Sequence, residues 1–208
     1  QIAHVSNGDA RRALSILERV SGLHSNNHIE FSNIEQYLGN PDLLHDPTGD
    51  SHYDITSAFI KCMRNSDPDA ALYWMARLLV GGDDPMFIAR RLVIFASEDI
   101  GNADLRALPV ALSCLQAIQS IGMPEAELIL GQTCTYLATA PKSNACTIAI
   151  RRAMTCAREH GPLAVPINIS NRKVGYKNPH NHPNSLVTQP LWPKSLNPQQ
   201  FYVPKPIG

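Results

Sequence analysis

The stretch SDPDAALYWMARLLVGGDDPMFIARRLVIFASEDIG, residues 66–101, carries the clearest structural signals in this 208-residue chain. It contains one helix-start device twice, an aspartate followed directly by a proline, as Asp67-Pro68 and Asp84-Pro85. Aspartate is a favoured N-cap residue, because its carboxylate accepts a hydrogen bond from a free backbone N–H, and proline is tolerated at the first helical position. Gly81 lies between them as a stop signal. The stretch therefore predicts two consecutive helices joined by a short turn.

The second of these helices, expected over 86–97, is apolar on almost every side. A helix of this kind is buried in a sizeable domain or at a subunit interface. Arg90 and Arg91 nevertheless fall in its middle, and buried guanidinium groups need partners. Glu98 and Asp99 are the expected partners within the chain, and pairing across a subunit interface is the alternative. All four are therefore candidate interface residues.

Similar apolar periodicity continues on both sides of this stretch, and no strand-like alternation competes with it. We expect about six helices with short loops between 53 and 161, which predicts an all-α helical bundle over 52–161. The region before it, 1–39, is expected to be part of a small helical unit, in which a capping box at Ser6 and Asp9 opens a helix over 6–21. Residues 40–51 are rich in Pro, Asp and Gly and are expected to form a linker.

The end of the chain, 162–208, has a different composition. Nine of the sixteen prolines lie after position 160, so long helices are excluded there. Aromatic residues are interleaved with the prolines, and their rings can have one of two roles. The tail packs on the helical domain and is anchored by these rings, or the rings stack on nucleic-acid bases.

Net charge is zero, but its distribution along the chain is uneven. Residues 1–141 carry nine basic and seventeen acidic residues, whereas 142–208 carry nine basic residues and one acidic residue. Such asymmetry indicates nucleic-acid contact or docking on an acidic surface, and the alternative is compensation within the protein or by a neighbouring subunit. The candidate DNA contacts are Arg151, Arg152, Arg172, Lys173 and Lys177.

Chemical motifs are sparse. The five cysteines have no CxxC spacing and fall in apolar helical patterns, so we expect small core residues rather than a zinc site. Phosphate-loop, dinucleotide-binding, nucleophile-elbow and HExxH motifs do not occur. His180 and His182 make a poor metal pair, and Cys156 with His160 lacks the surroundings of a catalytic thiol. No apolar run reaches the length of a membrane span, and no signal peptide is visible. We expect no catalytic residues, metal or membrane contact.

Four segments together resemble one family. VSNGDARRALSILE (5–18) is similar to the second-sensor motif of clamp-loader-type AAA+ ATPases. The segments 66–104, 121–145 and GYKNPH (175–180) resemble the C-terminal half of the replication-associated recombination protein A family, also called maintenance of genome stability protein A. Its eukaryotic counterpart is the Werner helicase-interacting protein. The chain departs from the family at 169–180, where relatives usually have a longer segment.

The resemblance implies a role and a set of partners. Residues 1–39 would be the remnant of an AAA+ lid, with Arg11 as the sensor arginine that contacts the γ-phosphate. Residues 52–161 would be an oligomerisation domain similar to the clamp-loader collar, which assembles homotetramers. The parent would be a DNA-dependent ATPase of replication forks that uses ATP and Mg and associates with single-strand-binding protein and the replisome. It would be cytoplasmic and nucleoid-associated in a bacterium, or nuclear in a eukaryote. This chain, without the phosphate loop, is expected to be inactive alone and to hold no cofactor.

Overall fold

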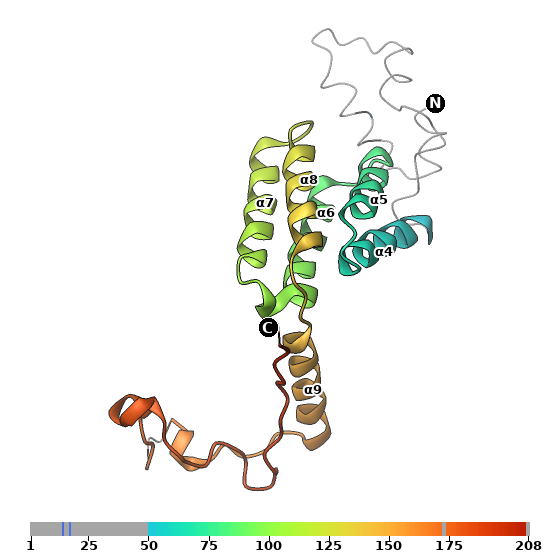
Figure 1. Ribbon diagram of the computed structural model, residues 1–208. Helices are drawn as coiled ribbons and strands as arrows, with labels where there is room; N and C mark the ends of the chain where they lie inside the picture. Colours follow the sequence, from blue (N-terminus) through green and yellow to red (C-terminus); the bar gives the residue numbers. More distant parts are fainter. Residues whose placement is uncertain (1–13, 15–16, 18–49, 172–173, 207–208) are drawn as a thin grey trace, which may run out of the picture.

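The computed structural model describes residues 50–171 and 174–206, together with positions 14 and 17. The described part of the chain forms six α-helices and contains no strand, so the all-α prediction is confirmed for these residues (Figure 1). The predictions for Arg11, for the helix over 6–21 and for most of the linker lie outside the described residues. The helices are α4 (Asp50–Arg64), α5 (Pro68–Val80), α6 (Pro85–Phe95), α7 (Ala107–Ile121), α8 (Ala126–Thr139) and α9 (Ala145–His160).

The two helix starts predicted from Asp-Pro pairs are confirmed. The Asp67 carboxylate accepts a hydrogen bond of 2.9 Å from the backbone N–H of Ala70, at the start of α5. At the start of α6, Asp84 accepts one of 2.9 Å from the N–H of Met86. Each cap satisfies a donor that the first helical turn leaves free.

Helices α4 to α8 pack into one bundle in which α8 contacts α4, α5, α6 and α7 (Figure 1). Large apolar side chains from α4, α5, α6 and α8 are fully buried in this bundle, and each contributes about 1.5–3 kcal/mol by leaving water. Cys134 lies in this core, and burial raises the pKa of its thiol to about 12. The largest of these side chains include Phe59, Met63, Leu78, Ile88, Leu92, Phe95, Leu130 and Leu137.

The connection from α6 to α7 is less regular than the sequence predicts. Helix α6 ends at Phe95 and passes into a π-helical turn, η2 (Ala96–Ile100), and a 3-10 turn, η3 (Gly101–Ala103). Asp99 and Ile100 are buried in this connection, which lies at the end of the bundle nearest α9 (Figure 1).

Helix α9 projects away from the bundle, and its main helical contacts are with η2 and η3 (Figure 1). Ala145, at its first turn, is the one α9 residue that is buried. Beyond it the described tail forms only short 3-10 turns, including Ile167–Ile169 and Pro179–Asn181, before its last residues run back alongside α9. The Lys205 amine donates a hydrogen bond of 2.6 Å to the Asn144 side chain at the start of α9.

Candidate functional site

The junction between the bundle and α9 is built on the π-helical turn η2. The buried carboxylate of Asp99 accepts two hydrogen bonds from Arg64 at the end of α4, at 2.6 Å from Nε and 3.0 Å from Nη2. This bidentate hydrogen bonding raises the pKa of Arg64, against the opposing effect of burial. Asp99 thereby links η2 to α4 across the bundle.

The neighbouring residue, Glu98, connects η2 to α9. Its side chain pairs with Arg151 at 3.1 Å, and its backbone carbonyl accepts a hydrogen bond of 3.0 Å from the Thr147 hydroxyl. Gly101 follows directly after η2 and has φ +50°. A Cβ at this position would lie 2.8 Å from the Ser143 backbone oxygen. The root of α9 is therefore held against the bundle by an ion pair, a hydrogen bond and a close backbone approach.

Lys142 stabilises the turn that leads into α9. Its amine donates hydrogen bonds of 2.7 Å to the backbone carbonyls of Ala138 and Ala140, and one of 3.0 Å to the Ser66 hydroxyl. These carbonyls belong to the C-terminal end of α8, where a cation is favoured. Partial burial lowers the pKa of Lys142.

The predicted pairing of Arg90 and Arg91 with Glu98 and Asp99 within the chain is wrong. Arg90 contacts Asp84 at 3.5 Å, and both side chains are more than half exposed, at 55% and 57%. The Arg91 guanidinium lies over the Phe87 ring, 5.0 Å from its centroid. The apolar pattern of α6 predicts burial on all sides, but the helix packs on α7 and α8 with one side and leaves Arg90 in solvent.

Helix α9 carries a line of exposed apolar residues. Ile150, Met154 and Ala157 fall at i, i+4 and i+7, which places them on one face. Ile150 is 58% and Met154 47% exposed. We call these three residues the α9 stripe. Water-exposed apolar faces of this kind mark contact surfaces.

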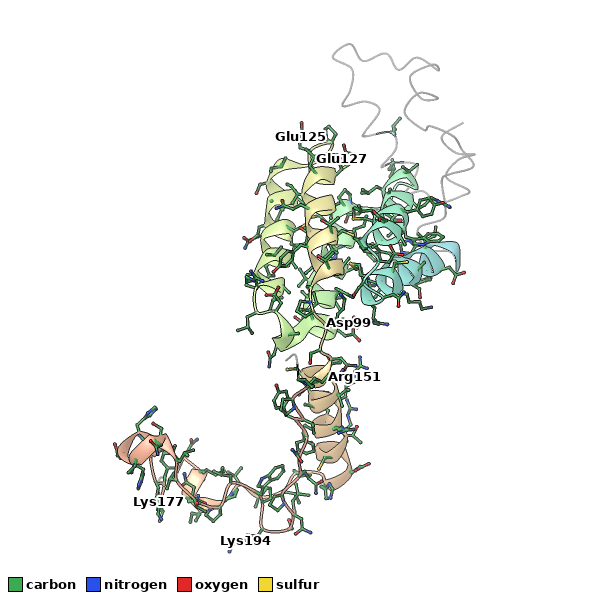
Figure 2. All side chains as sticks on the ribbon, viewed as in Figure 1. Asp99, Glu125, Glu127, Arg151, Lys177 and Lys194 are labelled. Carbon is green, nitrogen blue, oxygen red and sulfur yellow. The ribbon has the colours of Figure 1, made fainter. Side chains whose placement is uncertain are left out.

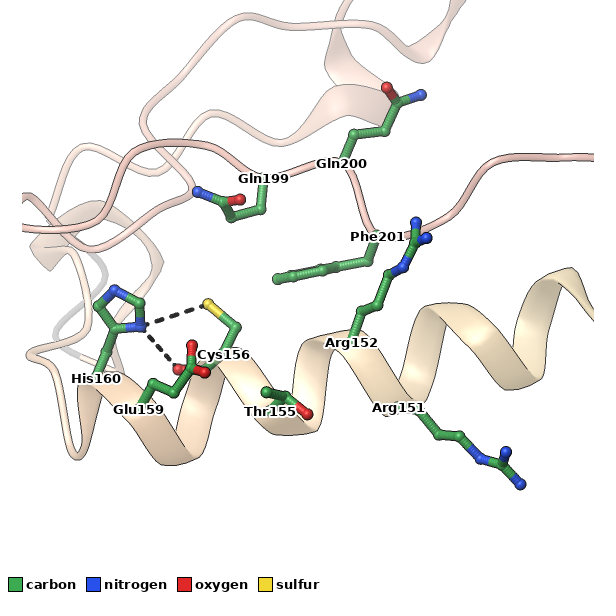
Figure 3. Close-up of a pocket in the computed structure, with 9 residues that line it drawn as sticks. All are labelled: Arg151, Arg152, Thr155, Cys156, Glu159, His160, Gln199, Gln200 and Phe201. Atoms are coloured by element: carbon green, nitrogen blue, oxygen red, sulfur yellow. Dashed lines mark hydrogen bonds between the residues drawn. The ribbon is translucent and has the colours of Figure 1, made fainter.

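On another side of α9, the helix and the returning tail line an open cavity of about 450 Å³ (Figure 3). The Phe201 ring points from the tail towards the helix, close to Cys156 and Arg152 (Figure 3). His160 Nδ1 lies 2.8 Å from the Cys156 carbonyl oxygen and 3.6 Å from its Sγ. Because that carbonyl can only accept, Nδ1 carries the proton and cannot act as a base towards the thiol. The cavity is lined by Arg151, Arg152, Thr155, Cys156, Glu159, His160, Gln199, Gln200 and Phe201.

The candidate DNA contacts are not gathered into one patch. Arg151 and Arg152 are neighbours on α9, and Arg151 is already paired with Glu98. Lys177 lies far from them in the irregular tail (Figure 2). Arg172 and Lys173 lie outside the described residues.

Comparisons with known proteins place the chain in a family. A family model described as MgsA AAA+ ATPase C terminal matches residues 65–208, and one described as AAA C-terminal domain matches 1–64. The chain belongs to the MgsA AAA+ ATPase C-terminal family. This match confirms the resemblance drawn from the sequence motifs.

Among curated relatives, the replication-associated recombination protein A of Haemophilus influenzae is 37% identical over all of this chain, and that of Escherichia coli K12 is 36% identical. The ATPase WRNIP1 of Dictyostelium discoideum is 33% identical over 97% of the chain. The chain spans 50% of the length of the first two relatives and 26% of the third. It therefore corresponds to only part of each of these proteins.

Two kinds of feature are absent from the residues that the structure describes. In that part of the chain, no three His, Cys, Asp or Glu side chains come together in a way that could hold a metal ion. Over the same residues, no helix has the length and apolar character that crossing a membrane requires.

Proposed function

We propose that this chain is the self-association and lid portion of a DNA-dependent AAA+ ATPase that maintains replication forks and acts in recombination and repair. In this proposal its helical domain, similar to a clamp-loader collar, gathers copies of the parent into a homotetramer. The names of the relatives and the two family models support the class of parent.

The observation that carries the self-association is the α9 stripe. Because α9 projects from its own bundle, the exposed side chains of the α9 stripe gain little free energy of burial within the described chain. Packing against another chain would remove this apolar surface from water, which is favourable. The junction supports the same role, because Glu98 and Gly101 hold the root of α9 in a defined orientation. A fixed projecting helix is better suited to recognition than one that must be ordered on binding.

The nucleotide chemistry belongs to the parent in this proposal. Arg11 acts as the second sensor, contacting the γ-phosphate of ATP that the parent's phosphate loop holds together with Mg. The chain alone contains no phosphate-loop sequence, so it hydrolyses no ATP by itself.

DNA and single-strand-binding protein are the proposed partners of the assembled parent, and nucleic-acid binding by the basic C-terminal third is the second candidate function. The specific observation in its favour is the charge of 142–208, where nine basic residues accompany one acid. If it is correct, retardation of single-stranded DNA will weaken steeply as salt rises, and joint replacement of Arg152 and Lys177 by Ala will reduce it.

The experiment for self-association compares variants of the chain by light scattering coupled to size exclusion. We expect Ile150→Asp with Met154→Asp to lower the mass to that of one chain, because the buried stripe would acquire two charges. The matched control is Val80→Asp, an equally exposed apolar residue at the end of α5, which should leave the mass unchanged. If the double variant keeps the assembled mass of the unmodified chain, the role of the α9 stripe is refuted.

A further inference from the structure

A second apolar surface lies on α7, on the bundle itself. Helix α7 contains no charged residue over its whole length, 107–121. Leu108 and Leu112 on this helix are 39% and 41% exposed, and Leu105 just before it is 76% exposed. We call Leu105, Leu108 and Leu112 the α7 face. Depletion of charge together with exposed large side chains is typical of the core of a protein interface.

The position of α7 leaves this face open. Helix α7 contacts α6, α8 and η2, while α4, to which the upstream residues connect, lies on the opposite side of the bundle (Figure 1). The tail runs along α9 and away from the bundle, so no described segment of the same chain covers the α7 face.

The α9 stripe and the α7 face match in form. The α9 stripe lies on a helix of 16 residues, and Leu108 and Leu112 of the α7 face lie on a helix of 15 residues; the two helices are about 24 and 22 Å long. They also match in charge. Residues 50–141 of the bundle carry eleven acidic and six basic residues, whereas the arm, 142–208, carries one acidic and nine basic residues. Glu98 with Arg151 is the single ion pair that joins these two parts among the described residues, so most of this complementarity is unused within one copy.

A second copy fits the arm better than the alternatives do. Pairing of α9 with α9 would bring two sets of arginines together, because Arg151, Arg152 and Arg158 all lie on this helix. A nucleic acid would match the charge but would leave aliphatic side chains without a partner. The arm exposes many of these, including Ile150, Met154, Val165, Leu186 and Leu191.

We propose that the α9 stripe of one copy packs on the α7 face of the next copy, so that the chains assemble head to tail. This inference rests on the proposed self-association and specifies its geometry. A contact between two different surfaces of identical chains closes into a ring when the rotation per subunit allows it. The acidic bundle of each copy then faces the basic arm of its neighbour.

The test is a complementation experiment on the 208-residue chain. The arm variant carries Ile150→Asp and Met154→Asp, and the face variant carries Leu108→Asp and Leu112→Asp. We expect each variant alone to sediment as a single chain of about 22.8 kDa. An equimolar mixture should form a species of twice that mass, because the intact arm of the face variant can dock on the intact face of the arm variant.

The possible outcomes separate this interface from the proposed self-association. Formation of the mixed dimer supports the interface and also shows that both variants are folded. If the unmodified chain assembles but the face variant assembles equally well, or if the mixture remains monomeric, the interface is overturned and self-association stands. If the unmodified chain is itself monomeric, both the proposed interface and the proposed self-association are refuted. If the arm variant keeps its assembled mass and loses single-stranded DNA, the arm serves nucleic acid instead.

Discussion

Asp104 collects four hydrogen bonds at the start of α7. Its carboxylate accepts from the Arg106 side chain at 3.0 and 3.3 Å, from the Arg106 backbone N–H at 3.0 Å and from the Tyr136 hydroxyl at 2.5 Å. The Arg106 side chain, then Tyr136, lower the pKa of Asp104 to about 2. These bonds connect the α6–α7 turn to α8, next to the α7 face.

The lowered pKa predicts a pH dependence of stability. The ionised form of Asp104 is favoured in the folded state, so its contribution is fully present above the ordinary aspartate pKa of about 4 and is lost as pH falls towards about 2. Asp104→Asn should therefore flatten the fall in unfolding free energy between pH 4 and pH 2. Urea unfolding at a series of pH values measures this dependence. If the unfolding free energy of the variant falls as steeply between pH 4 and pH 2 as that of the unmodified chain, ionised Asp104 is not the source of the stabilisation.

Gly101 gives a second prediction at the residue scale. Gly101→Ala should lower the free energy of unfolding by about 1–3 kcal/mol, because it adds strain at φ +50° and brings a Cβ to 2.8 Å from the Ser143 carbonyl. Gly82→Ala is the matched control, since Gly82 has φ +89° but nothing within 4 Å of a Cβ. Equal losses in the two variants, measured by denaturant unfolding, would show that the approach to Ser143 is unimportant.

Single residues were predictable from the sequence where their partners are local. Asp67 and Asp84 cap helices through bonds to residues two or three positions away, and this spacing is visible in the sequence. Arg64, the partner of Asp99, and Tyr136, the second partner of Asp104 besides the local Arg106, lie more than thirty positions away, so only the folded bundle reveals these contacts. The assignment of Glu98 and Asp99 to Arg90 and Arg91 failed for this reason.

At the scale of elements, the link between α4 and η2 supports a further prediction. Arg64→Gln should lower the free energy of unfolding by about 1–2 kcal/mol, because it leaves the buried Asp99 carboxylate without its charged partner; half-exposure of Arg64 reduces the effect. Arg90→Gln, which removes an exposed pair, is the control and should change it by less than about 0.5 kcal/mol. Thermal unfolding of both variants gives the comparison, and similar losses would argue against a structural role for the Arg64 pair.

Helices were the most predictable elements. Apolar periodicity and Asp-Pro starts indicated α5 and α6 in nearly their observed positions. The π-helical turn at Ala96–Ile100 was not predictable, because the local sequence continues the pattern of α6 and does not reveal that this turn packs on α7 and α9. The exposure of α9 was missed as well, since its apolar residues have the same spacing as those of a buried helix.

At the scale of the whole molecule, the uneven charge acquires a structural meaning. The boundary near residue 141 that the sequence shows is also where the chain leaves the bundle and enters the α9 arm. Figure 2 shows Glu125 and Glu127 at the far tip of the bundle, with Arg151, Lys177 and Lys194 on the arm. A chain with its acidic and basic halves separated in this way is suited to meeting copies of itself.

Sedimentation equilibrium of the unmodified chain, over a wide range of concentrations, is the most direct measurement of self-association. The tetramer we propose would give a mass about four times 22.8 kDa, and dilution would reduce it towards the mass of one chain. A mass of 22.8 kDa at every concentration would contradict the account.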